Sequence, residues 1–115
     1  MDNVKSRWLW MLQVASGVAL VLLLGLHWIA QHYLASEGLR SFIEVVTYLK
    51  QPIALGLELG FLIVVTGHAL LGIRSIVLDL DLTPELQRSL DIFLWFGGLF
   101  TVIYGIQLVL QIIHQ

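Results

Sequence analysis

The chain has 115 residues, of which 58% are hydrophobic and only 12% are charged, far fewer charges than a soluble globular domain carries. Its formal net charge of -2 excludes nucleic-acid binding, which needs a basic surface. Without cysteine it has no disulfide, thiolate zinc site, iron–sulfur ligand or covalent haem attachment of its own, and histidine is its only strong transition-metal ligand. A membrane span takes about 20 residues, so there is room for three spans and no soluble catalytic domain.

The first predicted span covers about residues 8–34 and has aromatic residues at both ends, as interfacial anchors do. The basic residues before it resemble the start of a signal peptide, but the apolar run is too long for one. No Arg- and Ser-rich transit peptide is visible, so we expect a prokaryotic plasma membrane. The polar residues of the span follow one another at steps of three and four, with Leu20 and Leu24 filling one gap: Gln13, Ser16, His27 and Gln31. This spacing puts them on one helix face, predicted to face protein or a cofactor.

The segment after the first span is too charged to cross a membrane. Apolar residues recur in it at helical spacing: Leu39, Phe42, Ile43, Val46 and Leu49. This pattern predicts a short amphipathic helix over about residues 37–50, lying in the interface. A second span follows Pro52 and covers about residues 53–78. Its glycines Gly56, Gly60 and Gly67 fall nearly on one face, which predicts the close approach of another helix or a flat ring.

The third predicted helix begins at Thr83-Pro84-Glu85, where a threonine N-cap precedes a proline at the first helical position. Its span covers about residues 88–113. The predicted fold class is therefore an all-α membrane protein, a single membrane-anchor domain over residues 1–115. It has three transmembrane helices and a short interfacial helix between the first two.

The basic residues favour one orientation of these helices. The N-terminal tail and the second connection share a side of the membrane and carry four of the six: Lys5, Arg7, Arg74 and Arg88. The other side has Arg40 and Lys50. The positive-inside rule then predicts a cytoplasmic N-terminus and an external C-terminus.

His68 is the candidate functional residue that the rest of the chain frames. On its helix, Gly72, Ser75 and Asp79 return close to its azimuth, and Arg74 lies on the flank near the cytoplasmic end. The imidazole can ligate haem iron, the glycine leaves space for a macrocycle, and the guanidinium can pair with a propionate. The alternative is that His68 makes an interhelical hydrogen bond, Gly72 is a packing notch and Arg74 extends to the headgroups.

A second deep histidine, His27, lies on the polar face of the first span and favours the haem interpretation. With the span midpoints at Val21 and Thr66, His27 lies about 9 Å toward the outside and His68 about 3 Å toward the inside, for a rise of about 1.5 Å per residue. A separation of about 12 Å is too large for a shared iron. If both bind haem, they bind different haems, and each needs a second ligand from another chain.

The string HALLGIRSIVLDLD, which begins at His68, resembles the histidine motif of the cytochrome b membrane-anchor subunits of succinate:quinone oxidoreductase, complex II. In that motif a glycine, an arginine and an aspartate follow the histidine, here Gly72, Arg74 and Asp79. Ser16-Gly17, followed by His27, resembles the first helix of the two-haem anchors. The three-span layout extends the resemblance to nearly the whole chain.

The resemblance implies a subunit that is not an enzyme by itself. It would pair with a second small anchor, dock a flavoprotein and an iron–sulfur subunit on the cytoplasmic side, and help to pass electrons to quinone. His68 and His27 would be axial ligands of haem b, one or two haems shared with the partner anchor, with Gly72 and Ser16 beside the cofactor. Arg74 would bind a propionate or the quinone.

One departure concerns the quinone site. Several single-haem anchors carry an arginine just before the Ser-Gly pair, where this chain has Val14. The quinone candidates are therefore other polar or aromatic residues near the cytoplasmic end: Gln13, Trp8 and Asp79, together with Ser16.

Two other function classes compete with the electron-transfer interpretation. One is a structural anchor without a cofactor. The other is a small transporter component with a proton path through His27, His68 and Glu58. The remaining polar residues are interpreted plainly: Glu58 as interfacial, Tyr104 as packed, and His32 and His114 as solvated near the outer interface.

Overall fold

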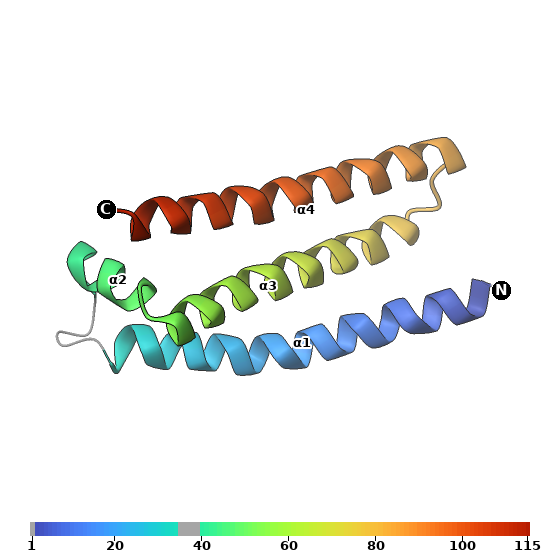
Figure 1. Cartoon of the computed structure of the whole chain (residues 1–115). Helices are drawn as coiled ribbons and strands as arrows, with labels where there is room; N and C mark the ends of the chain where they lie inside the picture. The colour runs from blue at the N-terminus through green and yellow to red at the C-terminus, as the bar shows by residue number, and fades with distance from the viewer. Residues whose placement is uncertain (1, 35–39) are drawn as a thin grey trace.

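The computed structural model describes residues 2–34 and 40–115 of the chain, and the described residues form helices and no strand. The elements in chain order are α1 (Asp2–His32), α2 (Phe42–Leu49), α3 (Pro52–Leu78) and α4 (Pro84–Ile113) (Figure 1). The three long helices are apolar and long enough to cross a membrane, and α2 lies between the first two of them. The predicted fold class is confirmed.

The starts of α4 and α2 differ from the predicted ones because side-chain caps set them. α4 begins four residues before the predicted span, where the Thr83 hydroxyl accepts a hydrogen bond from the Leu86 N–H at 3.4 Å. α2 begins at Phe42 because Ser41 and Glu44 form a reciprocal capping box. The start of the predicted interfacial helix, residues 37–39, lies outside the described residues.

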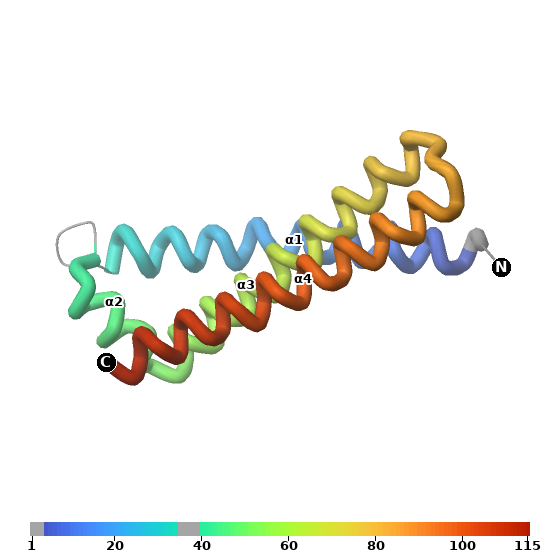
Figure 2. The backbone as a smooth tube through the Cα atoms, turned by 90° about the horizontal axis from the view of Figure 1, so that it is seen from above, coloured from blue at the N-terminus to red at the C-terminus, as the bar shows by residue number. Residues whose placement is uncertain are grey.

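α3 is the middle helix of the three spans. It packs against α1 on one side and against α4 on the other, and within the described chain the backbones of α1 and α4 are not in contact. Figure 1 shows the three in a row, and Figure 2, seen from above, shows α4 crossing over α3. The described part measures 52 × 26 × 20 Å. The spans therefore form an open layer, and α2 packs against α3 and α4 at the end that also holds the C-terminus.

Two glycines of α4 allow its close approach to α3. A Cβ atom at Gly105 would lie 2.6 Å from Leu62 Cδ2, and one at Gly98 would overlap the Leu70 side chain. The glycines of α3 behave differently: a Cβ at Gly56, Gly60 or Gly67 would meet nothing within 4 Å. No described helix of this chain uses the predicted glycine face of α3.

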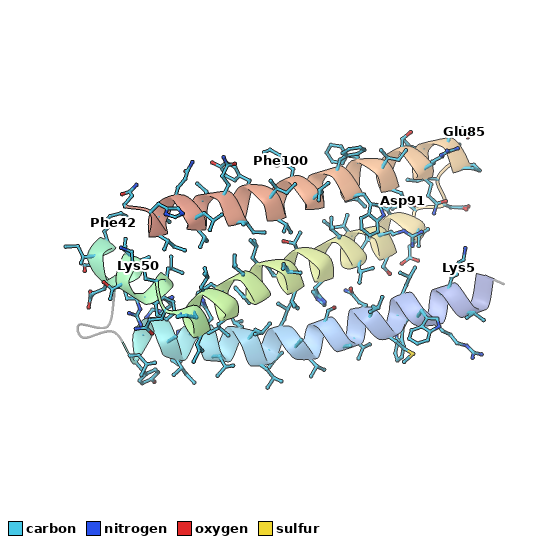
Figure 3. All side chains as sticks on the ribbon, in the orientation of Figure 1. Lys5, Phe42, Lys50, Glu85, Asp91 and Phe100 are labelled. Atoms are coloured by element: carbon cyan, nitrogen blue, oxygen red, sulfur yellow. The ribbon has the colours of Figure 1, made fainter. Side chains whose placement is uncertain are left out.

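The best-buried part of the described chain is the end covered by α2. The buried residues there are Ala30, Tyr48, Leu49 and Ala54. Elsewhere large apolar side chains point outward, as Figure 3 shows for Phe100 on the outer side of α4, which is 68% exposed. Such a surface suits hydrocarbon and partner helices, not water.

Candidate functional site

His68 is held by α1 through its Nδ1 atom, which lies 2.9 Å from Ser16 Oγ. Ser16 Oγ also lies 3.0 Å from the Gln13 carbonyl oxygen, to which it donates. A hydroxyl has one hydrogen to donate, so Ser16 Oγ accepts the bond from the His68 Nδ1–H. The hydrogen-bond pattern thus assigns the tautomer in which His68 Nε2 carries a lone pair.

Gly17 brings the α1 backbone against the same imidazole. A Cβ atom at Gly17 would lie 3.3 Å from His68 Cε1, closer than an ordinary contact. Ser16 and Gly17 together therefore fix the plane and the position of the His68 ring.

The side chain of Gln13 occupies the space beside Gly72. A Cβ at Gly72 would lie 3.2 Å from Gln13 Nε2, so the glycine makes room for the amide. Gln13 Oε1 is buried, and no described residue donates a hydrogen bond to it. A buried acceptor without a donor is costly, so this atom is open to a donor from outside the chain.

Arg74 lies about one and two-thirds turns beyond His68, and its side chain reaches α4. Its Nε donates to Asp91 Oδ1 at 3.1 Å, and both side chains are about 30% exposed. Beside it lies a cleft of about 350 Å³ between α1 and α3, here called the Arg74 cleft. Its lining includes Lys5, Leu9, Trp10, Gln13, Leu71, Arg74 and Ser75.

Some of the predicted site residues lie around this cleft and others lie away from it. The structure brings Gln13, Ser16, His68, Gly72 and Arg74 together where α1 faces α3. Trp8 is 61% exposed and Asp79 is the exposed C-cap of α3, and neither lines the Arg74 cleft.

Trp10 and Lys5 line the cleft and are absent from the predicted set. The sequence could have predicted Trp10, because it lies three residues before Gln13 and so falls on the polar face of α1. Lys5 contributes a second cation beside Arg74.

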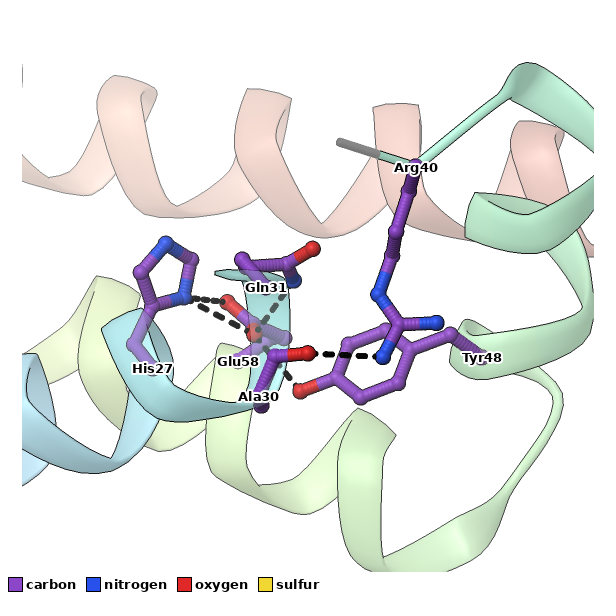
Figure 4. Close-up of polar contacts among 6 residues, drawn as sticks. All are labelled: His27, Ala30, Gln31, Arg40, Tyr48 and Glu58. Carbon is purple, nitrogen blue, oxygen red and sulfur yellow. Dashed lines mark hydrogen bonds and ion pairs between the residues drawn. The ribbon is translucent and has the colours of Figure 1, made fainter. Parts of the chain in front are cut away.

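A second polar cluster, the Glu58 cluster, lies near the α2 end (Figure 4). His27 Nδ1 lies 2.9 Å from Glu58 Oε1 and 2.8 Å from Oε2. The Tyr48 hydroxyl donates to Oε1 at 2.9 Å, and Gln31 Nε2 donates to the same oxygen at 3.3 Å. The Glu58 side chain is only 14% exposed. Glu58 is expected from the sequence only to lie at the membrane interface. In the structure it also forms hydrogen bonds with side chains of α1 and α2.

Arg40 and Tyr48 cover this cluster. The Arg40 guanidinium carbon lies 4.3 Å from the Tyr48 ring centroid, and its Nη2 donates to the Ala30 carbonyl at 2.7 Å. Burial, and then the hydrogen bond to Glu58 and its charge, raise the pKa of Tyr48 to about 12, whereas Arg40 acts in the opposite direction. Tyr48 therefore remains a protonated donor to Glu58 at neutral pH.

The two histidines occupy different levels of the α1–α3 pair. His68 lies opposite Ser16 and Gly17. His27 lies opposite Glu58 and stacks on Phe61 with ring centroids 5.2 Å apart. The ten residues from Glu58 to His68 correspond to about 15 Å of helix. This geometry agrees with the expectation that the two imidazoles do not share an iron.

Both imidazoles have the form that a haem ligand needs. In each ring the Nδ1 atom is bonded to an oxygen of the facing helix. Among the described residues, no hydrogen bond or ion pair reaches either Nε2. Iron-ligating histidines are oriented in this way, by a hydrogen bond from the second nitrogen.

The other residues weighed at the start lie outside both clusters. Tyr104 is exposed on α4 and stacks on Phe100 of the same helix with ring centroids 5.8 Å apart. His32 closes α1 beside Trp28, and His114 caps α4. Both are exposed at the α2 end.

Comparison with known proteins gives one consistent result. Residues 3–106 match the family model described as the succinate dehydrogenase/fumarate reductase transmembrane subunit. A succinate dehydrogenase hydrophobic membrane anchor subunit of Thermoplasma acidophilum is 29% identical over 100 residues, 87% of this chain and 81% of that protein. One of Archaeoglobus fulgidus, with the same description, is 28% identical over 103 residues, 90% of this chain and 87% of that protein. No solved structure matches.

Proposed function

The chain belongs to the succinate dehydrogenase/fumarate reductase transmembrane subunit family, as a non-catalytic hydrophobic membrane anchor, and we propose that it binds haem b and helps to pass electrons to quinone. The observation that carries the proposal is the Ser16–His68 pairing. It presents an imidazole at membrane depth with Nδ1–H donated and Nε2 free. A haem held there supplies a one-electron couple.

His27 is the proposed axial ligand of a second haem b. Its Nδ1 is held by Glu58 and its Nε2 is free of hydrogen bonds from the described residues. The two histidines lie about 15 Å apart along the helices, so each haem takes its other axial ligand from a second anchor subunit. The open layer of α1, α3 and α4, with its unused glycine face, offers the surface for that subunit.

The Arg74 cleft is the proposed site for a propionate or for quinone. Asp91 bonds only the Nε of Arg74, which leaves the Nη groups to donate to an oxygen. Gln13 adds a buried acceptor without a donor, which suits the hydroxyl of a reduced quinone. Trp8 and Asp79 lie outside the cleft and are not part of this proposal.

The flavoprotein and the iron–sulfur subunit are the proposed soluble partners. The N-terminus of α1 and the α3–α4 turn lie at one end of the layer (Figure 1). Four basic residues belong to this end, against two at the other. We place it in the cytoplasm of a prokaryotic cell, with the partners docked there, because basic residues are retained inside.

The assembly copurified with this chain tests the proposal. We expect a flavoprotein and an iron–sulfur protein in it, a b-type band in the reduced-minus-oxidised spectrum, and succinate-dependent reduction of a quinone. An assembly that reduces quinone without a b-type band makes the chain a structural anchor and contradicts the haem proposal. An assembly without the two soluble partners contradicts the docking role.

A further inference from the structure

The two histidines differ in the group that accepts their Nδ1 hydrogen. For His68 the acceptor is the neutral hydroxyl of Ser16, whose own hydrogen is used by Gln13. For His27 it is the carboxylate of Glu58, with both oxygens within 2.9 Å. A hydrogen bond to a charged acceptor is about twice as strong as a neutral one.

From this difference we propose that Glu58 is a positioning residue that sets the orientation and the donor strength of the His27 imidazole. The inference rests on the proposed haem at His27 and adds a residue that acts on the iron through the ligand. A carboxylate that accepts Nδ1–H makes the imidazole a more basic ligand. A more basic ligand favours ferric over ferrous iron, so Glu58 lowers the potential of that haem.

The geometry holds the carboxylate in place for this role. Tyr48 from α2 and Gln31 from α1 donate to Oε1, so Glu58 keeps its position against His27. Phe61 stacks on the imidazole with an interplanar angle of 17°, which limits rotation of the ring. In Figure 4 the second ring nitrogen points away from Glu58.

The charge of Glu58 is not shared with a strong cation. The Arg40 guanidinium instead bonds the Ala30 carbonyl and covers the Tyr48 ring. Among the described residues no lysine or arginine forms an ion pair with Glu58. His27, which bonds it through Nδ1, is a neutral imidazole when its Nε2 ligates iron. From α4 three apolar side chains pack against the buried residues of this end: Val109, Ile112 and Ile113. Apolar surroundings strengthen the electrostatic effect of the carboxylate on the ring.

Redox titration of the haems in the whole purified complex tests the inference. Glu58→Gln keeps the shape and removes the charge. We expect it to retain both b-type haems and to raise the midpoint potential of the haem that His27→Ala removes. An expected change of about tenfold in the preference for ferric iron corresponds to about 59 mV for a one-electron couple.

Three matched variants complete the test. Ser16→Ala should shift the other haem and by less, because the bond that it removes is neutral. Glu85→Gln removes the same charge from an exposed position in the first turn of α4 and should shift neither haem. Glu58→Asp keeps the charge on a shorter side chain and should shift the His27 haem less than Glu58→Gln does.

The outcomes separate this inference from the proposed function. A wild-type complex without haem b contradicts the proposed function itself. Unchanged midpoints in Glu58→Gln, or an equal shift of both haems, overturn the inference and leave the haem sites standing. If Glu58→Gln loses the His27 haem while Glu58→Asp keeps it, the charge is what holds the ligand, which supports the inference. Loss in both variants overturns it, because Glu58 is then needed only to build this end of the chain.

Discussion

The His68 and His27 regions both hold an imidazole in place, but with different chemical groups. Each fixes an imidazole by a bond from Nδ1 to the facing helix, but one acceptor is a hydroxyl and the other a carboxylate. The Ser16 hydroxyl donates its own hydrogen to one backbone carbonyl. The Glu58 carboxylate accepts hydrogen bonds from two further side chains, one of which, Tyr48, belongs to α2. α2 is therefore part of the His27 region, because its Tyr48 donates a hydrogen bond to Glu58.

Packing separates the two regions in the same way. The buried cluster of the described chain lies at the His27 end. The His68 end has the Arg74 cleft and a buried glutamine oxygen without a donor. At the His27 end the polar groups are therefore largely satisfied and covered by residues of this chain. At the His68 end the cleft and the unpaired Gln13 oxygen leave room for a bound molecule or a partner subunit.

The largest expected effect comes from filling the space that separates α1 from His68. Gly17→Val places extra methyl groups where even a Cβ lies 3.3 Å from the imidazole. We expect the ring to be displaced and the His68 haem to be lost from the visible spectrum, with the His27 haem retained.

Gly25→Val is the matched control on the same helix, because a Cβ at Gly25 meets nothing within 4 Å. It should keep both haems. If Gly17→Val loses the His27 haem instead, the assignment of Gly17 to the His68 region is wrong.

A smaller effect is expected at the other end, from Tyr48→Phe. The variant leaves the Glu58 carboxylate with one donor fewer and should lower the stability of the complex by about 1.5–3 kcal/mol, as for a hydrogen bond to a charged group. The melting temperature of the complex in detergent measures this loss.

The pH dependence of that loss follows from the raised pKa of Tyr48. The folded state holds it at about 12 against an ordinary 10.0, so folding favours the protonated form. The contribution is complete below pH 10 and decreases as the pH rises from 10 toward 12. The gap in melting temperature between wild type and Tyr48→Phe should thus be constant up to about pH 9 and shrink above pH 10. A gap that widens with pH contradicts the hydrogen bond.

The smallest effect is expected from Asp91→Asn, which breaks the ion pair with Arg74. Both side chains are about 30% exposed, and such pairs contribute less than about 1 kcal/mol. The melting temperature should fall less than in Tyr48→Phe. A larger fall in melting temperature for Asp91→Asn than for Tyr48→Phe contradicts this comparison, because the polar contacts at the His68 end would then contribute more stability than those at the His27 end.

The sequence predicts the three spans and the polar face of α1 because both depend on short-range patterns. Apolar stretches of sufficient length identify the spans, and the repeat of three and four residues puts Ser16 and His27 on one face. The different levels of the two histidines follow from the helical rise alone, and the structure agrees.

The contacts of Glu58 depend on how the elements pack, which no short pattern specifies. Glu58 follows Tyr48 by ten positions in the chain, and the bend between α2 and α3 brings the two side chains together. The exclusion of Trp8 and the inclusion of Trp10 at the Arg74 cleft depend on the rotation of α1 against α3. The α3 glycines met no helix because their face is left open within this chain.

The most direct test of the account is the reduced-minus-oxidised spectrum of the whole complex carrying His68→Ala or His27→Ala, each compared with wild type. The account predicts two b-type signals in wild type and the loss of a different one in each variant, because the imidazoles lie at levels about 15 Å apart. Loss of the same single haem in both variants, or of none in either, contradicts it.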